Sequence, residues 1–285
     1  MYKILVPTDF SPFANNALEY ALSLAKEFGS VITIAHAFES TNPILNKLDS
    51  RIEREAYKEA ENKLSHLKES VNVNHPEISC TTHIEIAYPV AMVYDLSNTA
   101  NYDLIVMGTH GATRSIGLEG APVAMEYGSV TSSLVGEINI PILAIHENDQ
   151  FVKPTEFILL SDLQNMPSPD SYNFLRNLAS KFDAKVNILY IESKPSSISD
   201  AFEEMNDFEK IFEGIEYEYN VVKQKDVEQA ILNMIIDKNQ LLTVIAKEKS
   251  TLQNMFGQST SKYLANYFSK TLLVLPEYIT IYSNK

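Results

Sequence analysis

The glycines of this chain gather in one short stretch. Six of its nine glycines fall between residues 108 and 136, at Gly108, Gly111, Gly117, Gly120, Gly128 and Gly136. Glycine lets a backbone take positive φ and approach a ligand closely. Ser129 and Thr131 follow Gly128, and hydroxyls and free N–H groups at the start of a helix can hold a phosphate. The spacing leaves two interpretations open: a phosphate-binding loop, or a long loop that only crosses the edge of a sheet.

Three other side chains could take part in such chemistry. Asp9 ends the first apolar run, where it could bind a ligand or simply complement the dipole of the helix that follows. Arg114 is the only Lys or Arg between residues 103 and 140 and could pair with phosphate charge, or it could be a solvated surface arginine. His110 has the same two interpretations.

Several catalytic classes are excluded at the level of motifs. The chain has no Gly-x-Ser-x-Gly elbow and no Gly-Lys-Ser/Thr phosphate loop. Its six histidines all lie in the first half, and none of them has the short spacing typical of metal ligands. The single cysteine, Cys80, opens or precedes a strand and is expected to be a core thiol. The sequence therefore predicts a binding protein, with no metal site and no catalytic residue.

The elements that must position these residues alternate along the chain. Apolar runs of strand length occupy residues 3–7, 31–38, 83–87, 104–107 and 141–145. Helical patterns occupy residues 14–28, 49–71, 90–99 and 129–135, and Gly29 follows the first of them as a left-handed helix stop. Such alternation predicts an α/β fold, with a mostly parallel sheet and helices on both faces.

The same order then repeats. Strands are expected at residues 156–161, 186–191, 216–222, 241–246 and 271–275, and helices at 171–182, 198–212, 227–236 and 260–268. Asp162 ends the first strand of this half as Asp9 does in the first half, and Asp183 stands where Gly29 does. A tandem duplication explains the match: two doubly wound, five-stranded domains over residues 1–147 and 155–277.

The composition of the chain limits the kinds of partner that it is expected to bind. The chain has 285 residues, 45% of them hydrophobic and 21% charged, which is typical of a globular protein. Its net charge of −14 argues against nucleic acid as a partner. No apolar run approaches the roughly 18–20 residues that span a bilayer, and no signal peptide is evident, so no membrane association is expected. One cysteine requires no oxidising compartment, and we expect a cytoplasmic protein.

Three segments of the first half resemble the universal stress protein family. Residues 3–11 (KILVPTDFS) resemble its opening strand with the terminal acid, and residues 103–111 (DLIVMGTHG) its fourth strand and first glycine pair. Residues 128–131 (GSVT) resemble the start of its last helix, and 141–145 (PILAI) its closing strand. The resemblance implies the tandem form of this family, with the fold of the adenine-nucleotide alpha hydrolases.

The resemblance also implies a site for ATP or another adenine nucleotide, with or without Mg²⁺. By position, Asp9 would contact the ribose or adenine edge and Ala37 the base. Gly108 and Gly111 would wrap the phosphates, and Gly128, Ser129 and Val130 would donate to them. One departure is clear: sixteen residues, 112–127, separate Gly111 from Gly128 where the family motif has nine. These extra residues could cover the phosphates as a lid, or fill the pocket and abolish binding.

The second half keeps Asp162 but has Ala246-Lys247-Glu248-Lys249 in place of the glycine pair. We therefore expect a degenerate copy without a nucleotide of its own. The resemblance further implies that residues 141–145 and 271–275 pair antiparallel as an intramolecular pseudo-dimer, and the chain could also form a homodimer. Two alternative functions stay open: a stress protein that binds no nucleotide and acts through an unknown protein partner, and a weak ATP hydrolase.

Overall fold

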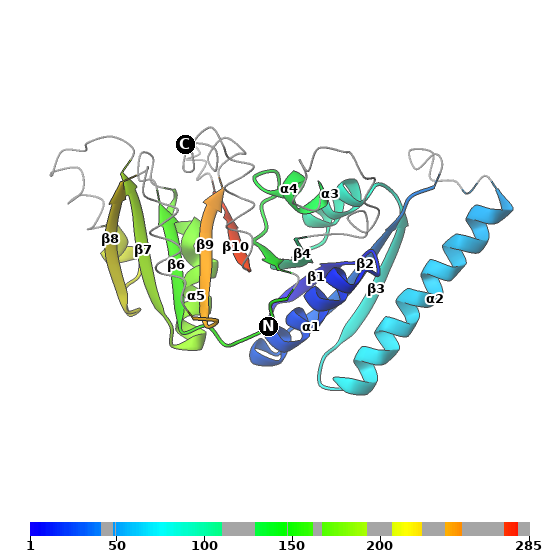
Figure 1. The fold of residues 1–285 in the computed structure, drawn as a ribbon, viewed down its shortest axis with the longest axis horizontal. Coiled ribbons are helices and arrows are strands. Elements are labelled where there is room, and N and C mark those ends of the chain that lie inside the picture. The colour runs from blue at the N-terminus through cyan, green and yellow to red at the C-terminus, as the bar shows by residue number, and fades with distance from the viewer. Residues whose placement is uncertain are drawn as a thin grey trace, which may run out of the picture. The chain divides into compact units, whose positions relative to one another are not determined.

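The computed structural model describes residues 1–40, 48, 50–109, 129–146, 148–161, 167–192, 207–223, 237–246 and 271–278. The chain divides into two compact units, Met1–Phe151 and Val152–Lys285, and each is described by itself (Figure 1). The domain limits 1–147 and 155–277 stay a prediction.

Among the described residues of the first unit, five strands form a parallel sheet. They are β1 (Lys3–Pro7), β2 (Val31–Phe38), β3 (Cys80–Ile86), β4 (Leu104–Gly108) and β5 (Ile142–Ile145). The order is β3-β2-β1-β4-β5, and every pair within the unit is parallel. The adjacent strands β1, β4 and β5 are buried over most of their residues, as their largely apolar sequences require. The predicted α/β fold is confirmed.

Helices cover both faces of this sheet. They are α1 (Pro12–Phe28), α2 (Arg51–Asn74), α3 (Pro89–Thr99) and α4 (Ser129–Leu134). The ring of Tyr2 contacts Phe28 of α1, and Phe38 contacts Tyr57 of α2. Tyr2 and Phe38 share one face, because the β1–β2 register aligns even-numbered positions. Helix α3 packs beside α4 (Figure 1), and right-handed crossovers put this pair on the other face.

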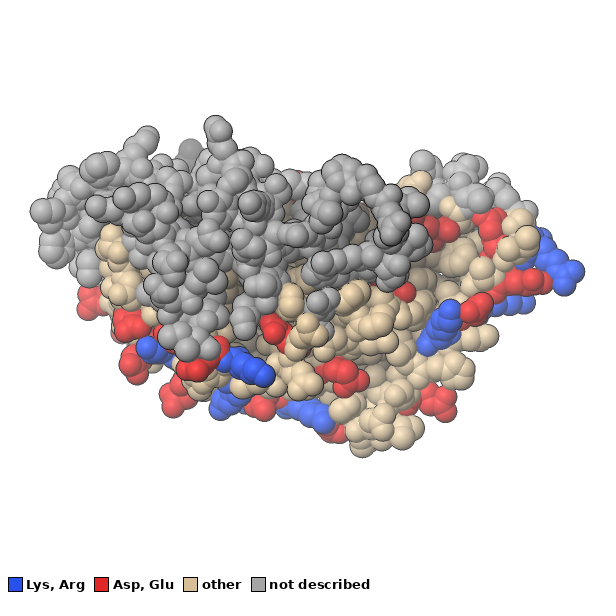
Figure 2. Space-filling view, viewed as in Figure 1, with Lys and Arg blue, Asp and Glu red and all other residues tan. Residues whose placement is uncertain are grey.

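Helix α2 is long and strongly charged. A capping box starts it: Glu53 N donates to Ser50 Oγ at 3.1 Å, and Ser50 N donates to the Glu53 carboxylate at 3.0 Å. Its buried residues are Ala60, Leu64 and Val71. In the view of Figure 2, acidic and basic side chains are interspersed on the described surface of the molecule. No helix within the described ranges is both long and apolar enough to cross a membrane.

The second unit repeats the arrangement. Its described strands are β6 (Glu156–Ser161), β7 (Lys185–Glu192), β8 (Tyr217–Lys223), β9 (Gln240–Ala246) and β10 (Leu272–Pro276), in the order β10-β9-β6-β7-β8 and all parallel. A 3₁₀ turn, Pro169–Tyr172, leads into α5 (Asn173–Phe182). The helices expected at 227–236 and 260–268, and most of that at 198–212, lie outside the described residues.

Strand β3 begins at Cys80 rather than at residue 83, and α2 likewise ends three residues later than expected, at Asn74. Cys80 is buried, as expected of a core thiol. Thr81 pairs with Thr33 of β2, and their hydroxyls lie 3.0 Å apart. Strand pairing therefore extends into a polar segment, which an apolar pattern cannot reveal on a sheet edge. Helix α1 also begins earlier than expected, because Ser11 caps it and Pro12 occupies its first turn.

The two matching helix ends provide a first prediction. Gly29 has φ 59° at the end of α1, as expected, and Asp183 has φ 54° at the end of α5. A Cβ at Gly29 would meet nothing within 4 Å, so the cost of a side chain there is conformational. Gly29→Ala should lower the free energy of unfolding by about 1 kcal/mol, and Asp183→Gly should raise it by up to ~1 kcal/mol.

Amide hydrogen exchange of α1 and α5 in the intact chain measures both changes. Opposite signs at the two positions are the expected result. A Gly29→Ala chain that exchanges as slowly as the wild type would contradict the assignment of a left-handed stop.

Candidate functional site

The sheet of the first unit reverses its direction of growth between β1 and β4. The chain leaves β1 for β2 on one side and leaves β4 for β5 on the other. In open parallel sheets, ligands bind beyond the carboxyl ends of the strands at such a reversal. Ile4 pairs with Leu104, and continuing this register brings Asp9 level with Thr109. The carboxyl ends of β1, β2 and β4 therefore form the candidate site.

Asp9 lies in a tight turn between β1 and α1, and it is exposed. Its carboxylate accepts a hydrogen bond from Ser11 N at 3.0 Å, while Phe10 N donates to Thr8 Oγ1 at 3.0 Å. The cap of α1 is Ser11, whose hydroxyl accepts from Ala14 N at 3.2 Å. The Asp9 carboxylate therefore shapes the turn that leads into α1, and the choice between a ligand contact and an acid that complements the α1 dipole stays a prediction.

His36 of β2 holds this turn from the side. Its Nδ1 lies 2.8 Å from the carbonyl oxygen of Thr8. A carbonyl can only accept, so Nδ1 carries the proton and Nε2 is the acceptor of the neutral ring. Burial lowers the pKa of His36 and outweighs the opposing effects of the Thr8 carbonyl and the Asp9 carboxylate. The ring centroids of His36 and Phe10 are 4.4 Å apart.

Ala37 follows His36 and is half-buried. Strand β1 pairs with β2 only as far as Ala35, which is aligned with Pro7 and accepts from Thr8 N at 2.8 Å. Ala37 therefore lies beyond the last residue of β1, at the same edge of the sheet as Asp9. Its expected contact with a base stays a prediction.

The end of β4 is tied to the start of α4. Thr131 Oγ1 donates to the carbonyl of Gly108 at 3.0 Å, and Thr131 is buried. Thr109 N donates to the carbonyl of Ile145 at 2.9 Å, which continues the β4–β5 pairing. Ser129 and Val130 are the first two residues of α4. The structure thus brings Gly108 next to the α4 start.

Several predicted site residues lie outside the described residues. These are Gly111 and Gly128, the segment 112–127 between them, His110, Arg114, and Asp162, Lys247 and Lys249 of the second half. Their roles, and the choice between a lid and a plugged pocket, stay predictions.

Three residues near Asp9 were not singled out from the sequence. Phe10 has a positive φ, which nothing in its residue type signals. His36 could have been noticed, because it directly precedes Ala37 at a strand end. Lys63 comes from α2, and its ammonium lies 5.9 Å from the centroid of the Phe10 ring. Only the packing of α2 on β2 brings it there.

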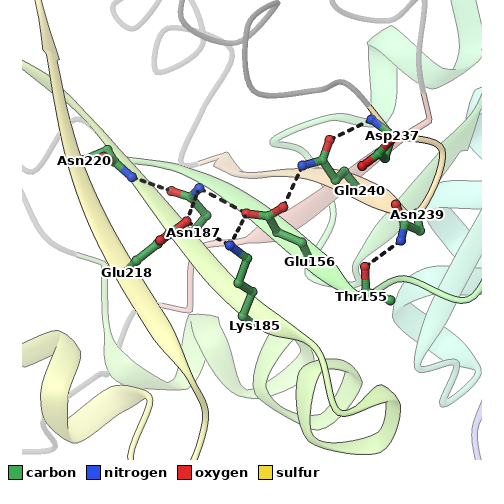
Figure 3. Close-up of polar contacts among 9 residues, drawn as sticks. All are labelled: Thr155, Glu156, Lys185, Asn187, Glu218, Asn220, Asp237, Asn239 and Gln240. Atoms are coloured by element: carbon green, nitrogen blue, oxygen red, sulfur yellow. Dashed lines mark hydrogen bonds and ion pairs between the residues drawn. The ribbon is translucent and has the colours of Figure 1, made fainter.

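The second unit carries a different polar cluster, which we call the amino-edge network. It lies at the amino ends of the strands (Figure 3) and consists of Glu156, Lys185, Asn187, Glu218, Asn220 and Gln240. Glu156 is 8% exposed and accepts from Gln240 at 2.6 Å, Asn187 at 3.1 Å and Lys185 at 3.2 Å. Burial raises the pKa of Glu156, but these three donors outweigh it and leave the pKa below its ordinary value. The network lies at the edge opposite to ligand sites, so its role is structural.

Metal chemistry has no support in the parts of the chain that the structure describes. They hold no group of three or more His, Cys, Asp or Glu side chains that could bind an ion. This absence concerns the described ranges alone.

Comparison with known proteins identifies a family that matches the first unit and solved structures that share the fold of the chain. A family model described as "Universal stress protein family" matches residues 1–146. A universal stress protein from Archaeoglobus fulgidus has 18% identity and a TM-score of 0.70, covering 97% of this chain and 98% of its own. A functionally unknown protein from Pseudomonas aeruginosa has 11% identity and a TM-score of 0.57, with 97% and 93% covered. These likenesses support the fold. No curated protein matches the chain.

Proposed function

The chain belongs to the universal stress protein family, and from this we propose that its first unit binds ATP or another adenine nucleotide, with or without Mg²⁺. The nucleotide would occupy the edge of the sheet where β1, β2 and β4 end. The protein acts as a binder in a stress response, and chemistry on the nucleotide is not part of the proposal.

One observation carries the proposal. The exposed carboxylate of Asp9, Ala37 near the end of β2 and the Gly108–Thr131 contact all belong to one edge of one sheet, at its reversal point. Residues that are far apart in sequence converge there, as a shared ligand requires.

The chemistry of these groups suits a nucleotide. A carboxylate such as Asp9 accepts hydrogen bonds from ribose hydroxyls or from the adenine amino group. Backbone N–H groups of the first helical turn, which include those of Ser129 and Val130, have no acceptor within α4. Such N–H groups bind phosphate oxygens without any basic side chain, so an acidic protein can hold ATP.

Calorimetry and thermal unfolding test the proposal directly. Millimolar Mg·ATP should release heat and stabilise the chain by about 2.7 kcal/mol once its concentration reaches 100 times Kd. Adenosine should bind more weakly, because it lacks the phosphates, and inorganic triphosphate should bind more weakly still. Hydrogen exchange should slow at the ends of β1 and β4, and the strands of the second unit should exchange as before.

Two other outcomes decide against this function. If millimolar ATP released no heat and did not stabilise the chain, the alternative function would be favoured: a universal stress protein that binds no nucleotide and acts through a protein partner. Phosphate release well above background, lost in Asp9→Ala, would favour the weak hydrolase.

A further inference from the structure

The backbone at Phe10 is strained. Its φ is 63°, and the other described residue that has a side chain and a positive φ is Asp183. Aspartate tolerates this region because its short polar side chain can bond locally, whereas a bulky residue there is an outlier. Such conformations persist only where surrounding contacts over-determine them, and they concentrate at functional sites.

Hydrogen bonds of the turn and contacts of the ring hold Phe10 in place. Its own N–H donates to Thr8 Oγ1, and the next N–H, of Ser11, donates to the Asp9 carboxylate, both at 3.0 Å. Its half-buried ring lies against His36 at 4.4 Å, and the ammonium of Lys63 is 5.9 Å from the ring centroid. This ammonium is within the range of a cation–π contact.

These contacts connect His36 to the residues on either side of Asp9. His36 binds the carbonyl of Thr8, before Asp9, and packs on the ring of Phe10, after Asp9. Asp9 is therefore clamped on both sides by one histidine. A glycine at position 10 would allow the same turn without strain, but it would leave His36 with no ring to pack on.

We propose that Phe10 is a positioning residue, whose ring, in contact with His36 and within cation–π range of Lys63, fixes the orientation of the Asp9 carboxylate for a ligand at the end of β1. The identity of that ligand rests on the proposed function, but the clamp itself does not.

The first measurement compares glycine with alanine. Phe10→Gly should melt about 2–4 °C above Phe10→Ala, because both lose the ring but only alanine keeps the strain. The control is Asn15, an exposed residue of α1, where Asn15→Ala should melt above Asn15→Gly as in any helix. If the alanine variant melted above the glycine variant at position 10, as at position 15, the backbone of Phe10 would not be strained, and the proposal would be contradicted.

The second measurement follows His36 by NMR titration, with His36→Gln identifying its signal. Phe10→Ala should raise the pKa of His36 toward its ordinary value, because the ring that buries it is gone. Lys63→Met should also raise this pKa, and Asp9→Asn should lower it further, since the two charges act in opposite directions. An unchanged pKa in Phe10→Ala would show that the ring does not hold His36, which contradicts the proposal.

The third measurement separates positioning from folding. Phe10→Tyr keeps the ring and should bind ATP within about twofold of the wild type, whereas Phe10→Gly should bind about tenfold more weakly, the equivalent of one hydrogen bond. Wild-type affinity in Phe10→Gly would overturn the positioning role. If the wild type bound no ATP, the proposed function would fail, and the melting order and the His36 titration would still decide whether Phe10 clamps Asp9.

Discussion

Replacement of Glu156 by alanine is expected to lower the free energy of unfolding of the second unit by about 2–3 kcal/mol. The change removes a carboxylate that accepts from Gln240, Asn187 and Lys185. Breaking a fully buried charged pair costs about 3–5 kcal/mol, but the side chain of Lys185 is 36% exposed and keeps Glu218 at 3.1 Å, so the cost is lower here.

Hydrogen exchange of the intact chain is the appropriate measurement, because a chain of two units need not unfold in one step. Amides of β6 and β7 should exchange faster in Glu156→Ala, and amides of β1 and β2 should not change. Glu213→Ala, an exposed substitution in the same unit, is the matched control and should stay within ~0.5 kcal/mol of the wild type.

The effect of Glu156 should depend on pH. Because its pKa in the folded chain is depressed, its contribution is fully present above the unfolded pKa of about 4.3 and is lost as the pH falls through the folded pKa. The difference between the wild type and Glu156→Ala should therefore be constant from about pH 6 to 8 and shrink in acid. A difference that stayed constant down to pH 3 would mean that the charge of Glu156 contributes nothing.

Replacement of Asp9 by alanine is expected to weaken ATP binding about 100-fold. The change removes both a charge-assisted hydrogen bond to the nucleotide and the hydrogen bond that shapes the turn. The carboxylate has two roles in this site. It accepts from Ser11 N, and under the proposed function it also accepts from the nucleotide.

Asp9→Asn separates these two roles. The asparagine oxygen can still accept from Ser11 N, so the turn should form, while the loss of charge should weaken ATP about tenfold. Asp95→Ala, an exposed acid on α3, makes the same change in net charge and should leave the affinity unchanged. Calorimetry on the three variants gives the answer, and wild-type affinity in Asp9→Asn would remove the carboxylate from the binding mechanism.

The existence and order of the described strands followed from the sequence, although some bounds, such as the start of β3, did not. β1, β2 and β6 have the expected bounds, because each is a largely apolar segment of strand length between polar residues. The left-handed end of α1 at Gly29 was also predicted, because its residue type carries the conformation. By contrast, Asp183 adopts the same geometry at the end of α5 and shows no such signal.

The site was predicted only in part. Asp9, Ala37 and Gly108 were expected at one edge because each stands at or near the end of a strand, and parallel strands bring these ends together; their roles in binding stay predictions. The contact between Thr131 and the Gly108 carbonyl depends on how α4 packs against β4, which no local pattern reports.

What the sequence determined by itself is the succession of elements, their duplication and the edge of the sheet where a ligand would bind, since periodicity and strand ends are local properties of the chain. Only the tertiary structure decided which side chains meet. The ring contacts of Phe10 with His36 and Lys63, and the hydrogen bonds of Glu156 with residues of β7 and β9, join groups that are distant in sequence. Such contacts exist only once packing has fixed the distances between elements.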